Sequence, residues 1–416
     1  MTQQFTGIFL ILGACALARA GEAVHRDFAL SPAALEVVSA PLAAHDTSQL
    51  PRLDVATIDR ERILKLATAA LALPLISITQ FPAMLSAGGR NDYYSNGDYW
   101  WPDPTKTHGL PFIQRDGQTN PQNFNRHRLA LRQLRDAVAA LGAAYKITGD
   151  DRYPGKAAEL LHGFFLDAAT RMNPHLKYAQ AIPGVSPGRG VGIIDTLHLI
   201  EVPTAIDAMR KSPAFPAVTL AGLQGWFRDY SRWMTTSNNG RDEAAAKNNH
   251  AVAFWLQVAV FAKFTGDAAQ LTECRRQFKE VFLPNQMAAD GSFPAELSRT
   301  KPYAYSIFQL DNMATLCQVL SVPDENLWLF ELRDGRGIRK AVAYLHPFIA
   351  DKSKWPLKPD VMAWDGWPAR QCSLLFAGLA FGVPSYLDLW TKLPPDPPDE
   401  EVQRNIAITQ PVLWLD

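Results

Sequence analysis

The sequence predicts an all-α fold in which helical hairpins repeat and close into an (α/α) toroid. From residue 125 onward, successive runs carry apolar residues at the i, i+3, i+4 spacing of a helix that is buried on one side. The alternation typical of strands is scarce. Two similar helix stops, at 145–150 and 263–267, contain a glycine that can form a left-handed cap and an aspartate that can begin the next helix. Their separation, about two hairpins, favours a repeating toroid; an irregular helical bundle is the alternative.

Composition and charge set the limits of the interpretation. The chain has 416 residues, enough for one large or two medium domains, and 41 basic residues balance 41 acidic ones. A net charge of zero argues against nucleic acid as a partner. It leaves room for a local basic cleft, because electrostatic attraction depends on where the charges lie.

The first 20 residues are predicted to be a signal peptide. An apolar run at 8–18 ends in Ala18-Arg19-Ala20, a small-x-small cleavage pattern. A lipoprotein signal that lipidates Cys15 is the alternative. No other segment approaches the ~20 apolar residues of a membrane span. We therefore expect a water-soluble protein that is secreted or periplasmic, with a lipid anchor if Cys15 is modified.

The rest of the chain is assigned in order. Residues 21–53 lack a clear period and are predicted to be an extended N-terminal arm, and 54–393 is predicted to be the toroid domain. Within it, a first helix at 55–73 stops at Pro74, and a long aromatic loop follows at 88–121. The Pro-rich tail at 394–416 is predicted to be a linker or surface strap whose apolar end docks back. The predicted helical runs are 125–148, 154–169, 193–211, 217–236, 246–265, 268–288, 303–320, 336–349 and 370–382.

The cysteines predict neither a metal site nor a catalytic thiol. Cys274, Cys317 and Cys372 are widely spaced and lack the paired spacing of a zinc site. Three buried thiols, or one disulfide with one spare thiol, are both compatible with this spacing. We expect no cofactor.

Two helix starts carry the residue types needed for β-elimination on a uronic acid. The first opens with Asn248, Asn249 and His250, and the second contains Arg299 and Tyr305. Elimination needs donors that neutralise the carboxylate, a base for the C5 proton and an acid for the O4 leaving group. Amide and guanidinium groups suit the first task, and histidine and tyrosine the other two. Each residue also has a structural interpretation, such as a helix cap, a packed ring or a surface charge.

Further candidates for substrate binding lie outside these starts. The aromatic loop offers flat rings on which sugars can stack, or it is a hydrophobic plug. His198, on a predicted helix after a Gly-rich stretch, is a sugar contact or a packed histidine. Arg370 is a second carboxylate-binding residue or part of a structural ion pair. The candidates for substrate binding are Tyr94, Tyr99, Trp100, His198, Asn248, Tyr303 and Arg370.

Several motifs, in the right order along the chain, resemble those of the alginate lyase superfamily of toroidal polysaccharide lyases, most closely polysaccharide lyase family 38. They are the stretches 92–104 and 188–196, then Asn249-His250, Arg299 and Tyr305 within 304–310, and the resemblance spans about residues 85–380. The resemblance implies a toroid of six or seven hairpins that cleaves polyuronates without a required metal. It also implies that Asn249 and Arg299 neutralise the carboxylate, that Tyr305 protonates the leaving oxygen, and that His250 lies across the sugar ring.

The expected substrate is a β-1,4-linked polyuronate, with alginate first and glucuronan second, acted on by a monomer. Two other classes of protein stay open. A glycoside hydrolase on the same scaffold would need two carboxylates, and a non-catalytic binding protein would need only the groove and the aromatic loop. The carboxylates available to a hydrolase are Asp195, Glu201, Asp242 and Glu296.

Overall fold

The structure is a computed structural model that describes residues 52–415. The predicted signal peptide, Cys15 and nearly all of the predicted N-terminal arm lie outside these residues. The longer helices are α2 (Arg60–Leu71), α3 (Arg126–Thr148), α4 (Arg152–Phe165), α5 (Glu201–Met209), α6 (Ala217–Thr236), α8 (Asn249–Thr265), α9 (Ala268–Arg276), α12 (Pro302–Leu320), α13 (Ile338–Ala350), α14 (Cys372–Phe381) and α15 (Pro384–Lys392).

Short helical turns complete the helical part of the described chain. The short α-helices are α1 (Val55–Ile58), α7 (Asn238–Ala244), α10 (Leu283–Gln286), α11 (Pro294–Leu297) and α16 (Glu400–Gln403). The remaining turns are 3₁₀ or π helices: η3 (Ile78–Gln80), η4 (Gly190–Ile200), η5 (Gln277–Phe282), η6 (Lys352–Lys354), η7 (Trp364–Gly366) and η8 (Pro411–Trp414).

The predicted all-α toroid is confirmed. Consecutive helices pack as hairpins, including α3 with α4, α8 with α9, and α14 with α15. The two predicted glycine stops end α3 and α8: Gly149 and Gly266 have φ of 72° and 76° in the left-handed region. The predicted run 193–211 differs, because it starts as η4 and becomes α5 only at Glu201. Pro203 explains the break, since it has no N–H to continue one hydrogen-bonded helix across the junction.

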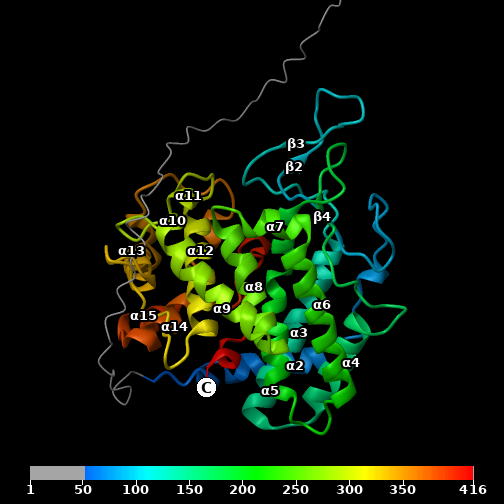
Figure 1. The fold of residues 1–416 in the computed structure, drawn as a ribbon, viewed down its shortest axis with the longest axis horizontal. Helices are drawn as coiled ribbons and strands as arrows, with labels where there is room; N and C mark the ends of the chain where they lie inside the picture. The colour runs from blue at the N-terminus through cyan, green and yellow to red at the C-terminus, as the bar shows by residue number, and fades with distance from the viewer. Residues whose placement is uncertain (1–51, 416) are drawn as a thin grey trace, which may run out of the picture. The chain divides into compact units, whose positions relative to one another are not determined.

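Helices α8 and α12 pack against each other in the core (Figure 1). Their residues are buried on every side, which is typical of helices surrounded by other helices. Both begin at the end of the helices where α7, α11 and the β2–β3 segment gather, at the top of Figure 1. The starts of α8 and α12 are the two segments that carry the candidate catalytic residues.

The predicted aromatic loop contains short strands. β1 (Tyr94–Asn96) pairs in parallel with β4 (Tyr178–Ala181), and β2 (Trp100–Trp101) pairs antiparallel with β3 (Ile113–Gln114). Tyr93 and Tyr94 are buried, so the first part of the loop is anchored in the protein. Trp100 and Trp101 remain partly exposed.

The C-terminal segment docks against the helices. Arg135 on α3 donates to the carbonyl of Ala407 at 2.9 Å and pairs with Glu201 at 3.1 Å. Glu201 in turn accepts hydrogen bonds from the backbone N–H groups of Thr409 and Gln410. A buried ion pair therefore fixes the tail along α3 and α5.

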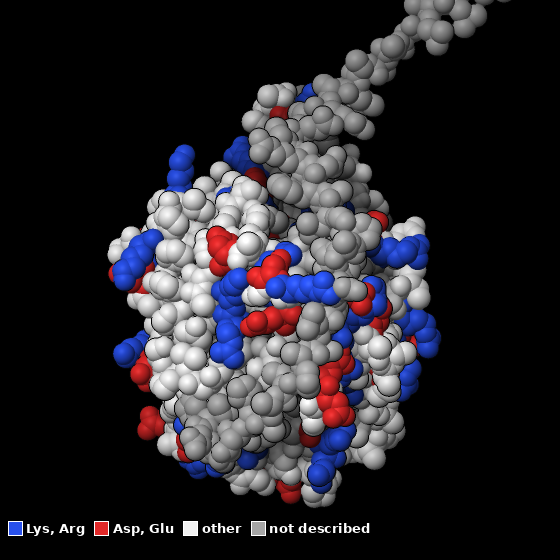
Figure 2. Space-filling model, turned by 60° about the vertical axis from the view of Figure 1, so that its left-hand side comes forward, with Lys and Arg blue, Asp and Glu red and all other residues white. Residues whose placement is uncertain are grey.

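Neither the surface charges nor the cysteines indicate a function. On the face drawn in Figure 2, basic and acidic side chains lie next to one another rather than in separate patches. In residues 52–415 no helix has the length and apolarity needed to cross a membrane. Cys274, Cys317 and Cys372 are free and buried.

Candidate active site

One open cavity brings the two predicted helix starts together. Asn249, His250, Arg299 and Tyr305 all line it. The other lining residues come from the aromatic loop, α3, the β4–η4 segment, α12 and the C-terminal segment. They are Asp98, Tyr99, Trp100, Gln114, Arg128, Gln180, Arg189, Val191, Ile194, Asp195, Leu197, His198, Phe308, Arg404 and Asn405.

Asn249 is held in place by Glu296, which precedes the second helix start. The backbone N–H of Asn249 donates to Glu296 Oε1 at 2.8 Å, and Nδ2 donates to Oε2 at 2.6 Å. Burial raises the pKa of Glu296, and the hydrogen bonds from Asn249 partly counteract this. An amide nitrogen has two hydrogens, so Asn249 keeps one for a ligand in the cavity.

His250 is held through one ring nitrogen. Its Nδ1 lies 2.6 Å from Oε1 of Glu243, a residue of α7 that is 1% exposed. Burial acts to lower the pKa of His250, but the charge and hydrogen bond of Glu243 outweigh it, and the net shift is upward. The imidazole is therefore oriented by its Nδ1 contact, which leaves Nε2 for the cavity.

We expect Glu243→Gln to lower the pKa of His250, because burial then acts without the paired carboxylate. Glu296 and Arg299 are the other charged groups that act on this imidazole, with opposite effects. The pKa is measured by NMR titration of the imidazole in the free protein. Asp242→Asn, on the same helix but exposed, is the matched control and should leave it unchanged. An unshifted His250 in Glu243→Gln would contradict this account.

Tyr305 lies in the first turn of α12 with its hydroxyl in a cluster of donors. The oxygens of Tyr305 and Tyr99 are 2.5 Å apart, and Nη2 of Arg299 lies 3.5 Å from the Tyr305 oxygen. Burial raises the pKa of Tyr305 well above its usual value, and negative charge on the Tyr99 oxygen would raise it further. Arg299 and Arg404 act in the opposite direction. The phenol is therefore protonated at neutral pH in the free protein.

Arg299 is positioned by the loop that follows β3. Its Nη2 donates to Asp116 Oδ1 at 2.8 Å, and the guanidinium lies 4.5 Å from the centre of the Tyr305 ring. Gly117, which follows Asp116 in the chain, has a φ of 74°, and a Cβ on this residue would lie 2.3 Å from Thr300 Oγ1. Only glycine allows this close approach, which brings Asp116 to Arg299.

A carboxylate that the sequence did not reveal caps the second helix start. Asp360 accepts hydrogen bonds from the backbone N–H groups of Tyr303 and Ala304, at 3.0 and 2.9 Å. These are N–H groups of the first turn of α12, which have no partner within the helix. Asp360 thereby fixes the turn that presents Tyr305.

Four of the predicted substrate-binding residues do not line the cavity. Tyr94 is 2% exposed, and its hydroxyl accepts from Asn96. Tyr303 donates to the carbonyl of Phe348, and Asn248 caps α8 through the N–H of His250. Arg370 pairs with Asp59 at 2.8 Å and packs over Trp390. These four residues have structural partners, and none enters the proposal below.

Tyr99, Trp100 and His198 do line the cavity. Burial lowers the pKa of His198 well below its usual value, and three nearby arginines lower it further. The imidazole is therefore neutral. Its Nδ1 is buried and has no hydrogen-bond partner among residues 52–415.

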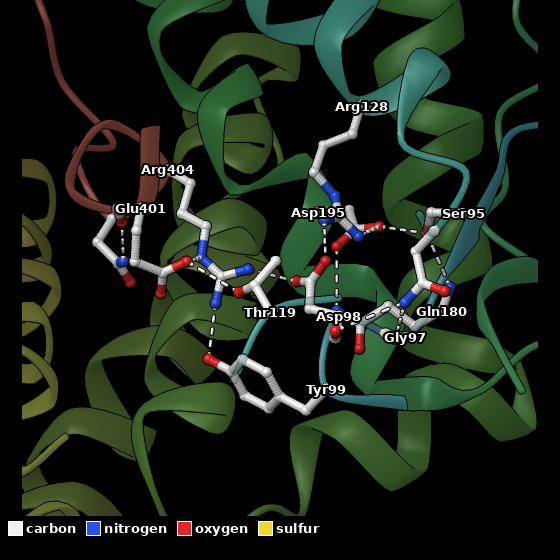
Figure 3. A network of polar contacts seen from close by, with 12 residues as sticks. Ser95, Gly97, Asp98, Tyr99, Thr119, Arg128, Gln180, Asp195, Glu401 and Arg404 are labelled. Atoms are coloured by element: carbon white, nitrogen blue, oxygen red, sulfur yellow. Dashed lines mark hydrogen bonds and ion pairs between the residues drawn. The ribbon is translucent and has the colours of Figure 1, made fainter. Parts of the chain in front are cut away.

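Several cavity residues escaped the sequence analysis. Arg128 on α3 pairs with Asp98 and Asp195, the latter at 3.1 Å. Asp98 lies in a stretch on which the family resemblance rests, so a signal was present for it, and Asp195 was considered only as a carboxylate for a hydrolase. Arg404 pairs with Asp98 from the opposite side at 2.5 Å (Figure 3). Nothing in the sequence around Arg404 indicated it.

Gln180 shows the strain expected of a functional position. It lines the cavity with a φ of 47°, one of two positive values among the described non-glycine residues. Its Nε2 donates to Asp195 at 3.1 Å, and its carbonyl accepts from Arg189 at 2.8 Å. A left-handed conformation costs a non-glycine residue about 1 to 2 kcal/mol, so these contacts hold a conformation that the backbone disfavours.

The carboxylates considered for a hydrolase do not form an acid and base pair. Glu201 is buried and pairs with Arg135, and Glu296 is buried and accepts hydrogen bonds from Asn249. Asp242 is exposed on α7. Asp195 shares Arg128 with Asp98. Burial acts to raise the pKa of Asp98, but the charges of Arg128 and Arg404 outweigh it and hold that pKa well below its usual range.

Comparisons with known proteins assign the chain to a family. An alginate lyase from Bacteroides ovatus, solved at 1.60 Å, is 33% identical, covers 87% of this chain and 94% of its own, and has a TM-score of 0.74. A histidine-to-alanine variant of alginate lyase A1-III in complex with a tetrasaccharide shares the fold, with 16% identity, coverage of 93% and 99%, and a TM-score of 0.52. No curated protein sequence matches. The family described as Alginate lyase matches residues 77–355, and the chain therefore belongs to this family and is a polysaccharide lyase.

Proposed function

We propose that the protein cleaves alginate by β-elimination, in the cavity formed by the starts of α8 and α12. One observation carries the proposal: Asn249, His250, Arg299 and Tyr305 come from two segments about fifty residues apart, yet all four line one cavity. The names of the family and of its solved relatives support alginate as the substrate. The motifs at 92–104 and 188–196 support a place in polysaccharide lyase family 38, and the apolar run at 8–18 supports export.

The donors around the cavity fit the task of neutralising the uronate carboxylate. Asn249 has a free amide hydrogen, and Arg299 has donors beyond those that bind Asp116. Donors of this kind make proton abstraction at C5 easier, because they stabilise the charge that moves onto the carboxylate. Trp100 and His198, which also line the cavity, are the proposed contacts for neighbouring sugars.

Stereochemistry divides the proton transfers between Tyr305 and His250. In mannuronate and glucuronate the C5 hydrogen and O4 lie on the same side of the ring. There, an ionised Tyr305 can take the C5 proton and then give it to O4, whose bond to C4 breaks as the C4–C5 double bond forms. In guluronate the two groups lie on opposite sides, so His250 takes the proton and a protonated Tyr305 donates its own to O4.

The rate on polymannuronate should rise with pH through and beyond neutrality. The base in this reaction is the ionised Tyr305, and burial raises its pKa well above the usual value. Each unit of pH below that pKa therefore reduces the active fraction about tenfold. The profile of kcat/KM against pH, followed by the ultraviolet absorbance of the unsaturated product, tests this expectation. A profile that is flat from acidic to alkaline pH would exclude a phenolate base.

A panel of polymers tests the proposal as a whole. Polymannuronate, polyguluronate, mixed alginate, glucuronan and a neutral glucan are incubated with the enzyme, and absorbance and product mass are recorded. Lyase action on alginate gives products with an unsaturated end that absorbs in the ultraviolet. If glucuronan were the preferred polymer, the proposed substrate would be wrong, but the proposed mechanism would stand. Saturated products with a new reducing end would indicate hydrolysis, which the paired states of Asp98 and Asp195 disfavour.

A further inference from the structure

We propose that Arg404, supplied by the C-terminal segment, is a positioning residue that directs the hydroxyl hydrogen of Tyr99 toward the oxygen of Tyr305. The inference deepens the function proposed above and rests on the assignment of Tyr305. The C-terminal tail, which the sequence predicts to be a linker or surface strap, then contributes a residue to the active site.

Arg404 connects three neighbours at the edge of the cavity. Its Nη2 donates to the Tyr99 hydroxyl at 2.6 Å, its Nη1 to Asp98 at 2.5 Å, and its Nε lies 3.0 Å from Glu401 (Figure 3). Glu401 also binds Lys301, and Asp98 also binds Arg128. The guanidinium is therefore fixed on two sides by carboxylates that have partners of their own.

The direction of the Tyr99–Tyr305 hydrogen bond follows from the chemistry of arginine. Two hydroxyls 2.5 Å apart share one hydrogen bond, and either oxygen can be the donor. A guanidinium can only donate, so the Tyr99 oxygen accepts from Arg404 and its own hydrogen points elsewhere. Tyr305 is the neighbour within reach. The Tyr305 oxygen then accepts from Tyr99 and lies near the Arg299 donor, which is the arrangement that favours a phenolate.

The charges around the two phenols come from several segments. Positive groups face the Tyr305 ring at 4.5 Å from Arg299 and at 5.0 Å from Lys301, and the Tyr99 ring at 5.4 Å from Arg404. Arg404 is the one of these three that also donates to Tyr99. The other charged and titratable groups that bind these residues or line the same cavity are Asp98, Asp116, Arg128, Arg189, Asp195, His198, His250 and Glu401.

Arg404→Met removes the donor and its charge while Asp98 and Glu401 keep Arg128 and Lys301 as partners. We expect the rising limb of kcat/KM on polymannuronate to move to higher pH by about one unit, since one nearby positive charge stabilises the phenolate by roughly that much. At a fixed pH on that limb the variant is about tenfold slower, and raising the pH by about one unit restores the rate. Arg404→Lys, which keeps the charge, should shift less.

The coupling to Tyr99 has its own test. If Arg404 acts through Tyr99, the double variant Tyr99→Phe/Arg404→Met should lose less activity than the product of the two single losses. Multiplicative losses would mean that the two residues act independently. An unshifted pH limb in Arg404→Met, with a normal melting temperature, would overturn the proposal.

A measurement without substrate separates this proposal from the lyase function. Tyrosine labelled with carbon-13 at Cζ gives an NMR signal that Tyr305→Phe assigns by its loss. The signal should begin to titrate at higher pH in Arg404→Met than in the parent protein. A shifted titration in a protein that forms no unsaturated product from any polymer would uphold the positioning role and reject the proposed function.

Arg62→Met is the matched control, because Arg62 also holds the tail. Its guanidinium binds Asp396 at 2.5 Å and the carbonyl of Thr409 at 3.0 Å, and it does not line the active-site cavity. We expect this variant to have a lower melting temperature and an unshifted pH limb. An equal shift in both arginine variants would mean that tail docking as a whole, and not the Arg404 contact, sets the behaviour of Tyr305.

Discussion

Tyr305→Phe should reduce cleavage of every uronan by about 10⁴-fold, because one phenol serves as the acid for all substrates and also as the base for some. The fold should persist. The change removes one oxygen, and Arg404 still holds Tyr99, so the expected loss of stability is about 1 kcal/mol. The measurement is the initial rate of ultraviolet absorbance on each polymer, together with a melting curve.

Tyr303→Phe is the control for this prediction. It makes the same change two residues away on the same helix, where the hydroxyl donates to the carbonyl of Phe348 outside the cavity. We expect near-normal turnover from that variant. If Tyr305→Phe kept more than about a tenth of the parent rate, the hydroxyl would lack the role proposed for it.

The sequence predicts the fold and the two helix starts because both leave local signals. Periodic apolar runs, glycine stops and the Asn248 cap are decided by neighbours within a few residues. The order of the motifs also agrees with the structure, because Asn249 and Tyr305 lie at the starts of α8 and α12, which are adjacent in the core. Local pattern and global arrangement agree at these positions.

The supporting residues left no such signal, because their partners are distant in the chain. Glu296 contacts Asn249, and Asp116 contacts Arg299 across nearly two hundred residues. Arg404 reaches Tyr99 from the far end of the sequence. In the sequence, an isolated arginine or aspartate of a surface turn cannot be distinguished from one in an active site. Its role depends on a tertiary contact that periodicity does not describe.

His250→Ala should separate the two kinds of substrate. Guluronate places its C5 hydrogen across the ring from O4, so its cleavage should fall by about 10³-fold, whereas polymannuronate cleavage should fall by no more than about tenfold. His346→Ala, on α13 and outside the cavity, is the control. Equal losses on both polymers would show that His250 neutralises charge rather than abstracting a proton.

The pH profiles of the parent enzyme should show the same division. His250 must be neutral to act as a base, and Glu243 raises its pKa, so cleavage of polyguluronate is lost as pH falls through that raised value. Polymannuronate instead needs ionised Tyr305, whose pKa lies well above that of a free phenol. Because any modestly raised imidazole pKa lies far below a raised phenol pKa, the guluronate limb should appear at lower pH than the mannuronate limb. Glu243→Gln should move the guluronate limb to still lower pH and leave the mannuronate limb in place, since only the first reaction uses the imidazole as its base.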